Sequence, residues 1–480
     1  DILENADVDF LMLEHLAERT LALLQEAKRS GKPGHVANLR YRMETLLPPA
    51  ADKGVRIVSN LGGADPIGAA ELVRTVAAEK GLGHLKVAAV TGDDITELVR
   101  ALDPVLLETG KKLSDLGTPL ICANAYIGAF QMKEALDAGA DVVLAGRVAD
   151  PALAVAPLAH HFGWRTDDYD KLALGTMAGH MLECAGHATG GNFADGGRRV
   201  VPDLDRLGFP IAEVDEDGVV ITKTITSGGL VDRHVVRQQL LYELGDPADY
   251  QTPDVVMDIS DVAAIDKGPD RVHLSGVRGR ERPKQLKVLC GVDNGWLGTA
   301  EISYGGWNAA GRAKLAGEIV TKRLRRDNKV SNLPLRVDVI GVNSVFLFGE
   351  PREDMLDARL RFCVRAPDQE TAQHALAEAE TLAAKFNITA ASLASVGEGL
   401  RFDSLANVEN LNTYGAELAR VNLRLARSGV GSNDQAALLD QRDNLLEKMS
   451  AFASLDTKFA SDGTVAVAIG PTPGTAFVNG

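Results

Sequence analysis

The stretch Val55-Arg56-Ile57-Val58-Ser59-Asn60-Leu61-Gly62-Gly63-Ala64-Asp65-Pro66 decides the fold class. Its first four residues have the composition of a short strand, and apolar residues at helical spacing follow the glycine turn over residues 69–80. Gly81 and Gly83 stop that helix, and residues 86–90 form the next strand. A strand, a helix and a strand in this order predict a βαβ unit, in which two parallel strands are joined by a right-handed crossover.

A second unit of the same kind follows. Residues 119–122 read as a strand, residues 131–138 as a helix and residues 141–144 as another strand. The pattern therefore predicts an α/β fold class, with a Rossmann-like parallel sheet of βα units over residues 1–165. Residues 166–382 mix a helix at 172–184, a hairpin at 214–221 and further short strands. They predict a mixed α+β domain.

The chain changes character near Leu382. Beyond it there is no His or Cys, and Leu411, Tyr414, Leu418, Val421 and Leu425 follow the alternating 3, 4 spacing of a helical seam. The seam continues through residues 438–452, after a predicted break at Ser428–Gly431 and N-cap residues at 432–434. Residues 457–459 and 464–469 then suggest a hairpin. We expect a third domain, residues 383–480, made of a coiled-coil-like helical segment and a β-hairpin.

Composition excludes several classes of protein. The net charge of −15 over 480 residues, with no basic stripe, disfavours a nucleic-acid partner. No apolar run approaches the roughly 20 residues that span a bilayer, so we expect no membrane partner. The four scattered cysteines fit reduced thiols in a cytoplasmic protein and form neither a disulfide framework nor a zinc pattern. The sequence starts at Asp1, without a Met or a signal peptide, and we expect a fragment.

The turn formed by Asn60, Gly62, Gly63 and Asp65 is a candidate anion site. It places backbone N–H groups at a helix N-terminus, where the helix dipole also favours a phosphate or carboxylate. Glycines are equally common in such turns for steric reasons alone. Both interpretations stay open at this point.

Polar side chains also follow the other predicted strands, where open α/β sheets place their ligand sites. These residues are Asp94, Asn124, Tyr126, Arg147 and Asp150. Together with Asn60 they predict a site at one sheet edge, where arginine suits a carboxylate or phosphate through paired hydrogen bonds. The local alternatives are helix capping by Asp94 or its neighbour Asp93, and a structural Arg147–Asp150 ion pair.

The segment from His180 to His187 is the sharpest local cluster. On a helix, His180, Glu183 and Cys184 share a face with His187, although Gly186 would end the helix before that residue. Glu183 could serve as an acid or base and Cys184 as a nucleophile, with buried helix packing as the alternative. We expect no metal. Gly190 and Gly191, in a later glycine-rich loop, could donate backbone N–H groups to an oxyanion.

Several of these motifs resemble one known family. They are Asn60-Leu-Gly-Gly-Ala-Asp-Pro, Val90-Thr-Gly-Asp-Asp, Ala123-Asn-Ala-Tyr-Ile-Gly, Ala138-Gly-Ala-Asp-Val-Val-Leu-Ala-Gly-Arg-Val-Ala-Asp and Gly179-His-Met-Leu-Glu-Cys. In this order they resemble the acyclic terpene utilisation (AtuA-like) family over about residues 7–382. The resemblance implies a cytoplasmic bacterial protein that degrades citronellol- and geraniol-type acids through acyl-CoA intermediates. The family also opens with a strand and a Gly-Phe-Trp-Gly-Asp loop that this sequence does not contain, so we expect an incomplete ligand site.

The tail resembles a different family. Leu438-Leu-Asp-Gln-Arg-Asp-Asn-Leu-Leu-Glu-Lys-Met and the seam before it are similar to the flagellar hook-associated protein of the hook–filament junction, over about residues 385–480. This second resemblance implies an assembly segment, and the two together suggest a fusion, or a chain pieced together from two proteins.

The two resemblances lead to two expected functions. The first is a non-redox hydrolase or lyase that acts on a branched acyl-CoA or carboxylate. Asp94, Glu183, Cys184 or His180 would be its catalytic residues, and it would need no cofactor beyond the coenzyme A carried by the substrate. The alternative is a flagellar structural protein. The hypothesis that the helical seam is an assembly surface leads us to expect a homo-oligomer.

Overall fold

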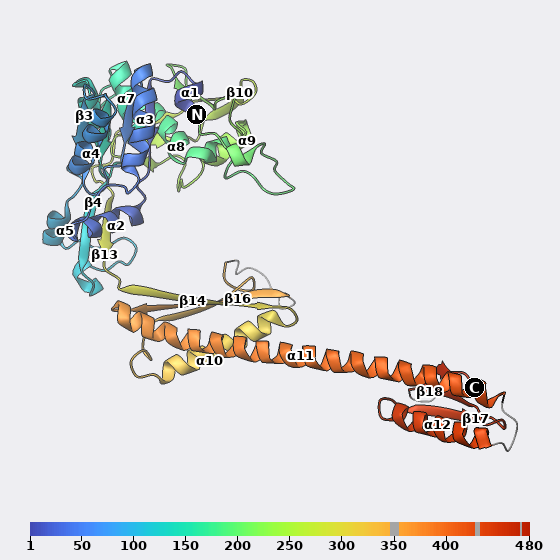
Figure 1. Ribbon diagram of the computed structural model, residues 1–480. Helices are drawn as coiled ribbons and strands as arrows, with labels where there is room; N and C mark the ends of the chain where they lie inside the picture. Colours follow the sequence, from blue (N-terminus) through green and yellow to red (C-terminus); the bar gives the residue numbers. More distant parts are fainter. Residues whose placement is uncertain (346–354, 428–432, 471–472) are drawn as a thin grey trace. The chain divides into compact units, whose positions relative to one another are not determined.

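The computed structural model describes residues 1–345, 355–427, 433–470 and 473–480, and these residues form two compact units (Figure 1). Unit 1 runs from Asp1 to Asn294 and unit 2 from Gly295 to Gly480. The predicted limit near residue 165 falls inside unit 1, whose largest core contains residues from both sides of it. The limit near residue 382 falls inside a single helix of unit 2.

Unit 1 contains helices α1 to α9 and strands β1 to β13. Its helices are α1 (Ile2–Asn5), α2 (Glu18–Arg29), α3 (Leu39–Lys53), α4 (Pro66–Glu79), α5 (Thr96–Leu102), α6 (Phe130–Asp137), α7 (Ala152–Phe162), α8 (Tyr169–Glu183) and α9 (Arg233–Leu240). Its strands are β1 (Phe10–Leu13), β2 (Arg56–Ser59), β3 (Val87–Val90), β4 (Leu120–Ala125), β5 (Val142–Ala145), β6 (Ile211–Val214), β7 (Val219–Thr222), β8 (Tyr250–Gln251), β9 (Val256–Asp258), β10 (Ala263–Asp266), β11 (Val272–Ser275), β12 (Arg278–Arg280) and β13 (Val288–Val292).

A parallel sheet with the strand order β1-β2-β5-β3 forms the centre of unit 1, which confirms the predicted fold class. The predicted direct pairing of β2 with β3 is wrong, because β5 lies between them. All four residues of β5 are buried, whereas β3 is half exposed. The most apolar strand therefore takes an inner position, where both of its faces can be covered.

The second predicted βαβ unit is also corrected. Strand β4 does not join the parallel sheet and instead pairs antiparallel with β13. On its other side the segment before α5 covers β4, through hydrogen bonds from Ile95 N to Ala123 O and from Ala125 N to Asp93 O. Both edges of β4 are thus occupied. Helix α6 connects β4 to β5, which is the strand that joins the parallel sheet.

Helices cover both faces of the parallel sheet. Ile57, Val142 and Leu144 pack with α3 and α4 on one face, while Val58 and Val143 pack with α6, α7 and α8 on the other. This alternation follows from the two-residue period of a strand, and each buried aliphatic side chain contributes about 1.5–3 kcal/mol. The predicted hairpin at 214–221 is present as β6 and β7, within the antiparallel sheet β10-β11-β7-β6. The remaining strands form the small sheet β12-β9-β8.

Unit 2 begins with a three-stranded antiparallel sheet, β14-β16-β15. The elements of this part are β14 (Trp296–Gly305), α10 (Ala309–Arg326), β15 (Leu335–Ile340), β16 (Asp357–Ala366) and the start of α11 (Gln369–Leu425). Leu360, Phe362 and Val364 pack against α10 and α11, while Arg359 and Arg365 on the same strand are exposed. The predicted period-two strand is therefore confirmed.

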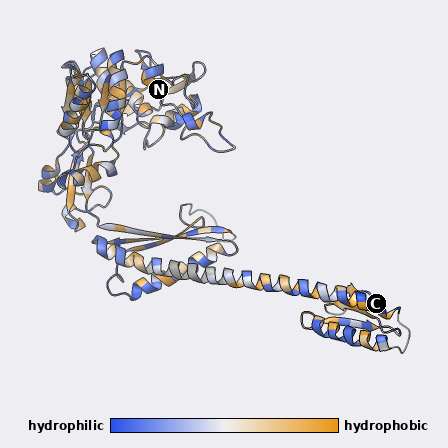
Figure 2. Cartoon of the chain, in the orientation of Figure 1, coloured by the Kyte–Doolittle hydropathy of each residue, from blue (hydrophilic) through white to orange (hydrophobic). Residues whose placement is uncertain are grey.

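The tail of unit 2 is built on α11, along which hydrophilic and hydrophobic residues alternate (Figure 2). Leu418, Val421 and Leu425 are buried against α12 (Asn433–Ser450), β17 (Leu455–Phe459), β18 (Val465–Ile469) and β19 (Thr475–Val478). The predicted hairpin is β17–β18, and β19 adds a third strand to it. The predicted helix break at Ser428–Gly431 and the N-cap residue Ser432 lie outside the described residues.

Candidate functional site

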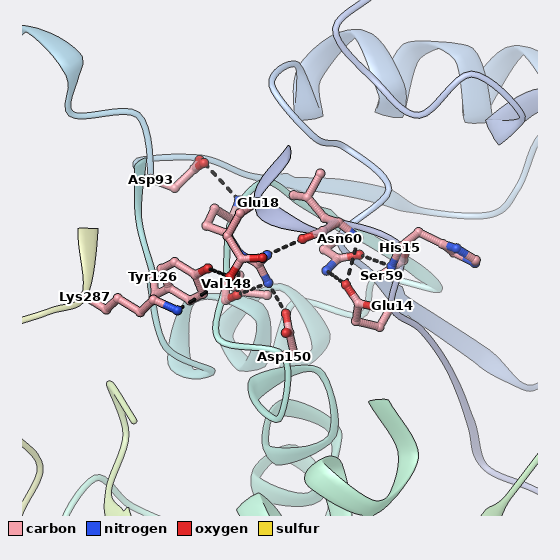
Figure 3. A network of polar contacts seen from close by, with 12 residues as sticks. Glu14, His15, Glu18, Ser59, Asn60, Asp93, Tyr126, Val148, Asp150 and Lys287 are labelled. Atoms are coloured by element: carbon pink, nitrogen blue, oxygen red, sulfur yellow. Dashed lines mark hydrogen bonds and ion pairs between the residues drawn. The ribbon is translucent and has the colours of Figure 1, made fainter. Parts of the chain in front are cut away.

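The loop after β1 joins the ends of two strands of the parallel sheet (Figure 3). The backbone N–H of His15 donates to Asn60 Oδ1 over 2.9 Å, and Asn60 Nδ2 donates to Glu14 Oε1 over 3.0 Å. Asn60 is completely buried. Its amide therefore holds the carboxylate of Glu14 at the carboxyl end of the sheet.

Arg147 is the centre of the polar network. Its guanidinium donates to the carbonyl of Leu16, to the carbonyl of Val148 (2.8 and 2.6 Å) and to Oδ1 of Asp150. It also lies on the ring of Tyr126, 4.5 Å from the centroid. Since the side chain is buried and its donors meet acceptors of the chain, the geometry gives Arg147 a positioning role. The predicted Arg147–Asp150 ion pair is present.

Asp93 connects three of the predicted strand ends. Its Oδ2 accepts from Asn124 Nδ2 and from the backbone N–H of Arg147, each over 2.9 Å. Burial raises the pKa of Asp93, and these two hydrogen bonds oppose that effect. Asp94 instead accepts from the backbone N–H and hydroxyl of Thr96 at the start of α5, as the local capping interpretation expects.

Tyr126 lies between two cations. Lys287 Nζ is 4.4 Å from the ring centroid, and the guanidinium of Arg147 also contacts the ring. The hydroxyl of Tyr126 donates to Glu18 Oε1 over 2.6 Å, and this bond lowers the pKa of Glu18 (Figure 3). Burial and the same bond raise the pKa of Tyr126. The ring is thus fixed by an acid and two cations.

The glycine turn after β2 is packed rather than open. A Cβ on Gly62 would lie 2.6 Å from Ala145 O, and one on Gly63 would lie 2.9 Å from Gly34 O. Asp65 caps α4 by accepting from the backbone N–H of Gly68, so a carboxylate of the chain already sits at this helix N-terminus. Steric need accounts for both glycines.

The second candidate donor loop is likewise occupied. The N–H of Gly190 donates to His187 O and that of Gly191 to Gly186 O, over 3.1 and 2.8 Å. Gly190 also has a φ of +103°, in the region that favours glycine. These two residues therefore close a turn, and the structure does not bring them to the network around Arg147.

His180 and Glu183 form a buried pair near the end of α8. His180 Nδ1 lies 2.8 Å from Glu183 Oε1, and its Nε2 lies 3.0 Å from Gln239 O. Glu183 Oε2 is buried and has no hydrogen-bond partner in the described part of the chain. Burial raises the pKa of Glu183, while His180 opposes the shift. One oxygen of this buried carboxyl group is therefore left without a hydrogen bond.

Cys184 and His187 do not lie on the helix face that was predicted to carry them. The helix ends at Glu183, and His187 lies in the 3₁₀ turn Ala185–Thr189, because Ala185 takes a positive φ of 47°. Burial raises the pKa of the Cys184 thiol to about 11. A thiol in this state is a poor nucleophile near neutral pH.

A cleft of about 380 Å³ borders Glu183. Its polar lining includes Glu14, His15 and Glu183, and most of the rest is apolar. The carboxyl groups of Glu14 and Glu183 also act electrostatically on that of Asp150. Burial raises the pKa of Asp150 to about 7, the two acids add to the shift, and Arg147 opposes it. Glu14 and Glu183 thus line an apolar cleft, and both act electrostatically on Asp150, which does not line it.

The comparisons with known proteins concern the chain as a whole. The family model described as "Acyclic terpene utilisation family protein AtuA" matches residues 1–398, most of the 480-residue chain. The chain belongs to the AtuA family. A second family model, "Flagellar hook-associated protein FlgK helical domain", matches residues 354–480. The two matches overlap over residues 354–398, which include β16 and the first part of α11, and both predicted resemblances are confirmed. No curated protein and no solved structure matches the chain.

Not every residue of this AtuA family member's network was predicted. Glu14, His15 and Glu18 were missed, although Glu14 and His15 directly follow a four-residue apolar strand, the same signal that identified Asn60. In the described ranges no cluster of three or more metal-binding side chains occurs, and no helix is long and apolar enough to cross a membrane.

Proposed function

We propose that the AtuA-family region is a cytoplasmic enzyme that acts on a branched acyl-CoA or carboxylate by acid–base chemistry, as a hydrolase or lyase. The observation that carries this proposal is the buried Glu183 carboxyl, which is bonded to His180 through one oxygen and unbonded at the other. It borders a cleft with apolar walls, which suit a hydrocarbon next to an acid.

The hydrogen bonds of His180 determine where the proton lies between His180 and Glu183. Gln239 O can only accept, so Nε2 of His180 carries a hydrogen. In a neutral ring Nδ1 is then an acceptor, and Glu183 must donate to it. If the proton moves to Nδ1, the pair becomes an imidazolium and a carboxylate. A single proton shared in this way lets Glu183 act as acid or as base.

Asp150 is the second acid–base group of the proposal. A carboxyl whose pKa is about 7 can give or take a proton near neutral pH, as general catalysis requires. Arg147 holds Asp150 through an ion pair and is itself fixed by backbone carbonyls. We assign Arg147 and Asn60 the positioning of Asp150 and Glu14. Asp94, which bonds Thr96, is the weaker catalytic candidate.

The test is consumption of geranoyl-CoA, citronelloyl-CoA and their free acids, measured by mass spectrometry. Glu183→Gln keeps the shape of the side chain but removes its titration, so we expect kcat to fall by about 10²-fold or more. The matched control is Glu97→Gln on the exposed surface of α5, which should leave turnover unchanged. If the folded Glu183→Gln protein turns over substrate at the unaltered rate, the acid–base assignment is wrong.

We propose an assembly role for the tail as a second candidate function. The match to the FlgK helical domain over residues 354–480 supports it, as do the exposed apolar side chains Leu400, Leu405 and Val408 on α11. A homo-oligomer formed through this part of α11 would cover them. Light scattering of the full chain at increasing concentration tests the idea, and a monomer throughout would exclude it.

A further inference from the structure

The sheet β14-β16-β15 of unit 2 is covered by helices on one face (Figure 1). On the middle strand β16, Leu360 and Val364 are buried against α10 and α11. Because successive side chains of a strand point to opposite faces, Arg361, Cys363 and Arg365 lie on the other face. The first two are half-buried there and Arg365 is exposed. We call this second face of the sheet the open face.

Three arginines surround Cys363 on the open face. The strand register places Cys363 directly opposite Thr299 of β14 and Arg336 of β15, and opposed residues have Cβ atoms about 4.5–5.5 Å apart. Arg361 and Arg365 follow at two residues on either side along β16, at about 6.6 Å. The hydroxyl of Thr299 lies 3.8 Å from Cys363 Sγ. One thiol thus lies within reach of three guanidinium groups.

The carboxylates of the open face leave a surplus of positive charge near this thiol. Asp338 accepts from Nε of Arg336 over 3.0 Å and from Arg361 over 2.9 Å, so two arginines share one carboxylate. Glu301 is opposite Arg361 in the register but pairs with Arg359 instead. The cations beside the thiol are therefore only partly neutralised within the chain.

Two of these arginines also have unused donors. Arg365 makes no side-chain hydrogen bond or ion pair with another residue in the described ranges. Nε of Arg361 is buried and lacks a hydrogen-bond partner in the same ranges. A guanidinium stays charged and pairs best with a planar anion such as a carboxylate. The open face can therefore hold an anionic group next to Cys363.

The other cysteines lie in different surroundings. Burial raises the pKa of Cys122, Cys184 and Cys290, and a neighbouring carboxylate adds to the shift in each case. The thiolate is the form that reacts, so these three thiols are poor nucleophiles. Among the four cysteines, only Cys363 is flanked by three arginines.

We propose that Cys363 is a site of thiol–disulfide exchange with small disulfides that carry carboxylates, which Arg336, Arg361 and Arg365 hold in place. The thiolate of Cys363 attacks one sulfur of the disulfide and forms a mixed disulfide. The sulfur–sulfur bond of the reagent breaks, and its other half leaves as a thiolate that takes up a proton from water. The Cys363 sulfur is oxidised and the leaving sulfur is reduced, so no other oxidant is needed. This inference concerns unit 2, goes beyond the proposed function and does not depend on it.

The experiment compares three disulfides on the reduced full chain. They are oxidised glutathione, which carries carboxylates, the neutral 2-hydroxyethyl disulfide and the cationic cystamine. Mass spectrometry of peptides gives the rate at each cysteine, relative to the neutral thiol N-acetylcysteine amide. We expect glutathione to modify Cys363 faster than Cys184 or Cys290 by on the order of tenfold or more. The relative rate at Cys363 should fall from glutathione to 2-hydroxyethyl disulfide to cystamine.

Arg365→Gln is the decisive variant, because this exposed side chain has no partner that folding would lose in the described ranges. It should slow the reaction of Cys363 with glutathione by about threefold or more and leave that with 2-hydroxyethyl disulfide within about twofold. The matched control is Arg401→Gln, an exposed arginine of α11, which should change neither rate. Equal losses with both reagents in Arg365→Gln would overturn the proposal. So would an unchanged glutathione rate in that variant, or a Cys363 that reacts no faster than Cys184 and Cys290.

Discussion

The carboxylate of Asp93 accepts the backbone N–H of Arg147 over 2.9 Å, which joins the loop after β3 to the end of β5. The same oxygen accepts from Asn124 at the end of β4. Gly146 leaves room for this arrangement, because a Cβ there would lie 2.5 Å from Asp93 Oδ1. One buried carboxylate thus organises the strand ends that carry the candidate site.

Replacing Asp93 with Ala should therefore destabilise unit 1 strongly. The change leaves two buried donors, Arg147 N and Asn124 Nδ2, without an acceptor, and we expect a loss of about 2–4 kcal/mol in the free energy of unfolding. The neighbouring Asp94→Ala removes the acceptor of Thr96 at the start of α5 and of Gln25 Nε2, which also bonds Asn124, and should cost only about 1 kcal/mol. Urea unfolding of both variants measures the difference. Equal losses would contradict the role given to Asp93.

The raised pKa of Asp150 predicts that the stability of the fold depends on pH. Its pKa of about 7 lies above the value of about 3.9 in an unfolded chain. Between these values the folded state holds a proton that the unfolded state has lost, so the stability contributed by this group falls as pH rises through that window. Asp150→Asn does not titrate. Its melting temperature relative to the unaltered protein should therefore rise from about pH 5 to about pH 8.

Asp167→Asn is the control for this pH series. The exposed Asp167 bonds Arg165, which lowers its pKa, so its titration lies below the window that is compared. The melting-temperature difference for this variant should stay flat. If Asp150→Asn gives the same flat profile, the carboxyl of Asp150 is not held protonated near neutral pH.

Local patterns were enough to predict much of the fold. The strand at 55–58, the hairpin at 214–221 and the seam through Leu418 each depend on neighbours a few residues away. Pairings between distant residues were not predictable in the same way. Strand β5 enters between β2 and β3, and β4 pairs with β13, far along the chain, because burial and backbone satisfaction of the whole unit decide the order.

The site shows the same division. Sequence placed Asn60, Asn124, Arg147 and Asp150 at strand ends, and the structure brings them into one network. The sequence could not show that Arg147 is buried. Its guanidinium donates to the carbonyl of Leu16, which lies in a loop 131 residues away in the sequence. Nor could the sequence show that the glycine turn after Asn60 is filled by residues near Gly34.

Cys184 should be dispensable for turnover. Because burial raises the pKa of its thiol to about 11, roughly one molecule in 10⁴ carries the thiolate at neutral pH. Cys184→Ala should keep kcat within about twofold of the unaltered enzyme, in contrast to Glu183→Gln. Turnover of geranoyl-CoA by both variants provides the comparison. A large loss in Cys184→Ala with an unchanged melting temperature would restore the thiol as a nucleophile.

Leu418→Asp should unfold the tail rather than report on assembly. Leu418 is 0% exposed and packs within the chain against α12 and the terminal sheet, so an aspartate there would be a buried unpaired charge. We expect a loss of at least about 3 kcal/mol in the stability of this part.

Leu405→Asp changes a side chain that is 63% exposed on the same helix, and should leave the melting temperature unchanged. Circular dichroism separates the two variants, and light scattering then asks whether Leu405→Asp alters the oligomeric state. An oligomer that survives Leu405→Asp would place any assembly surface away from this stretch of α11.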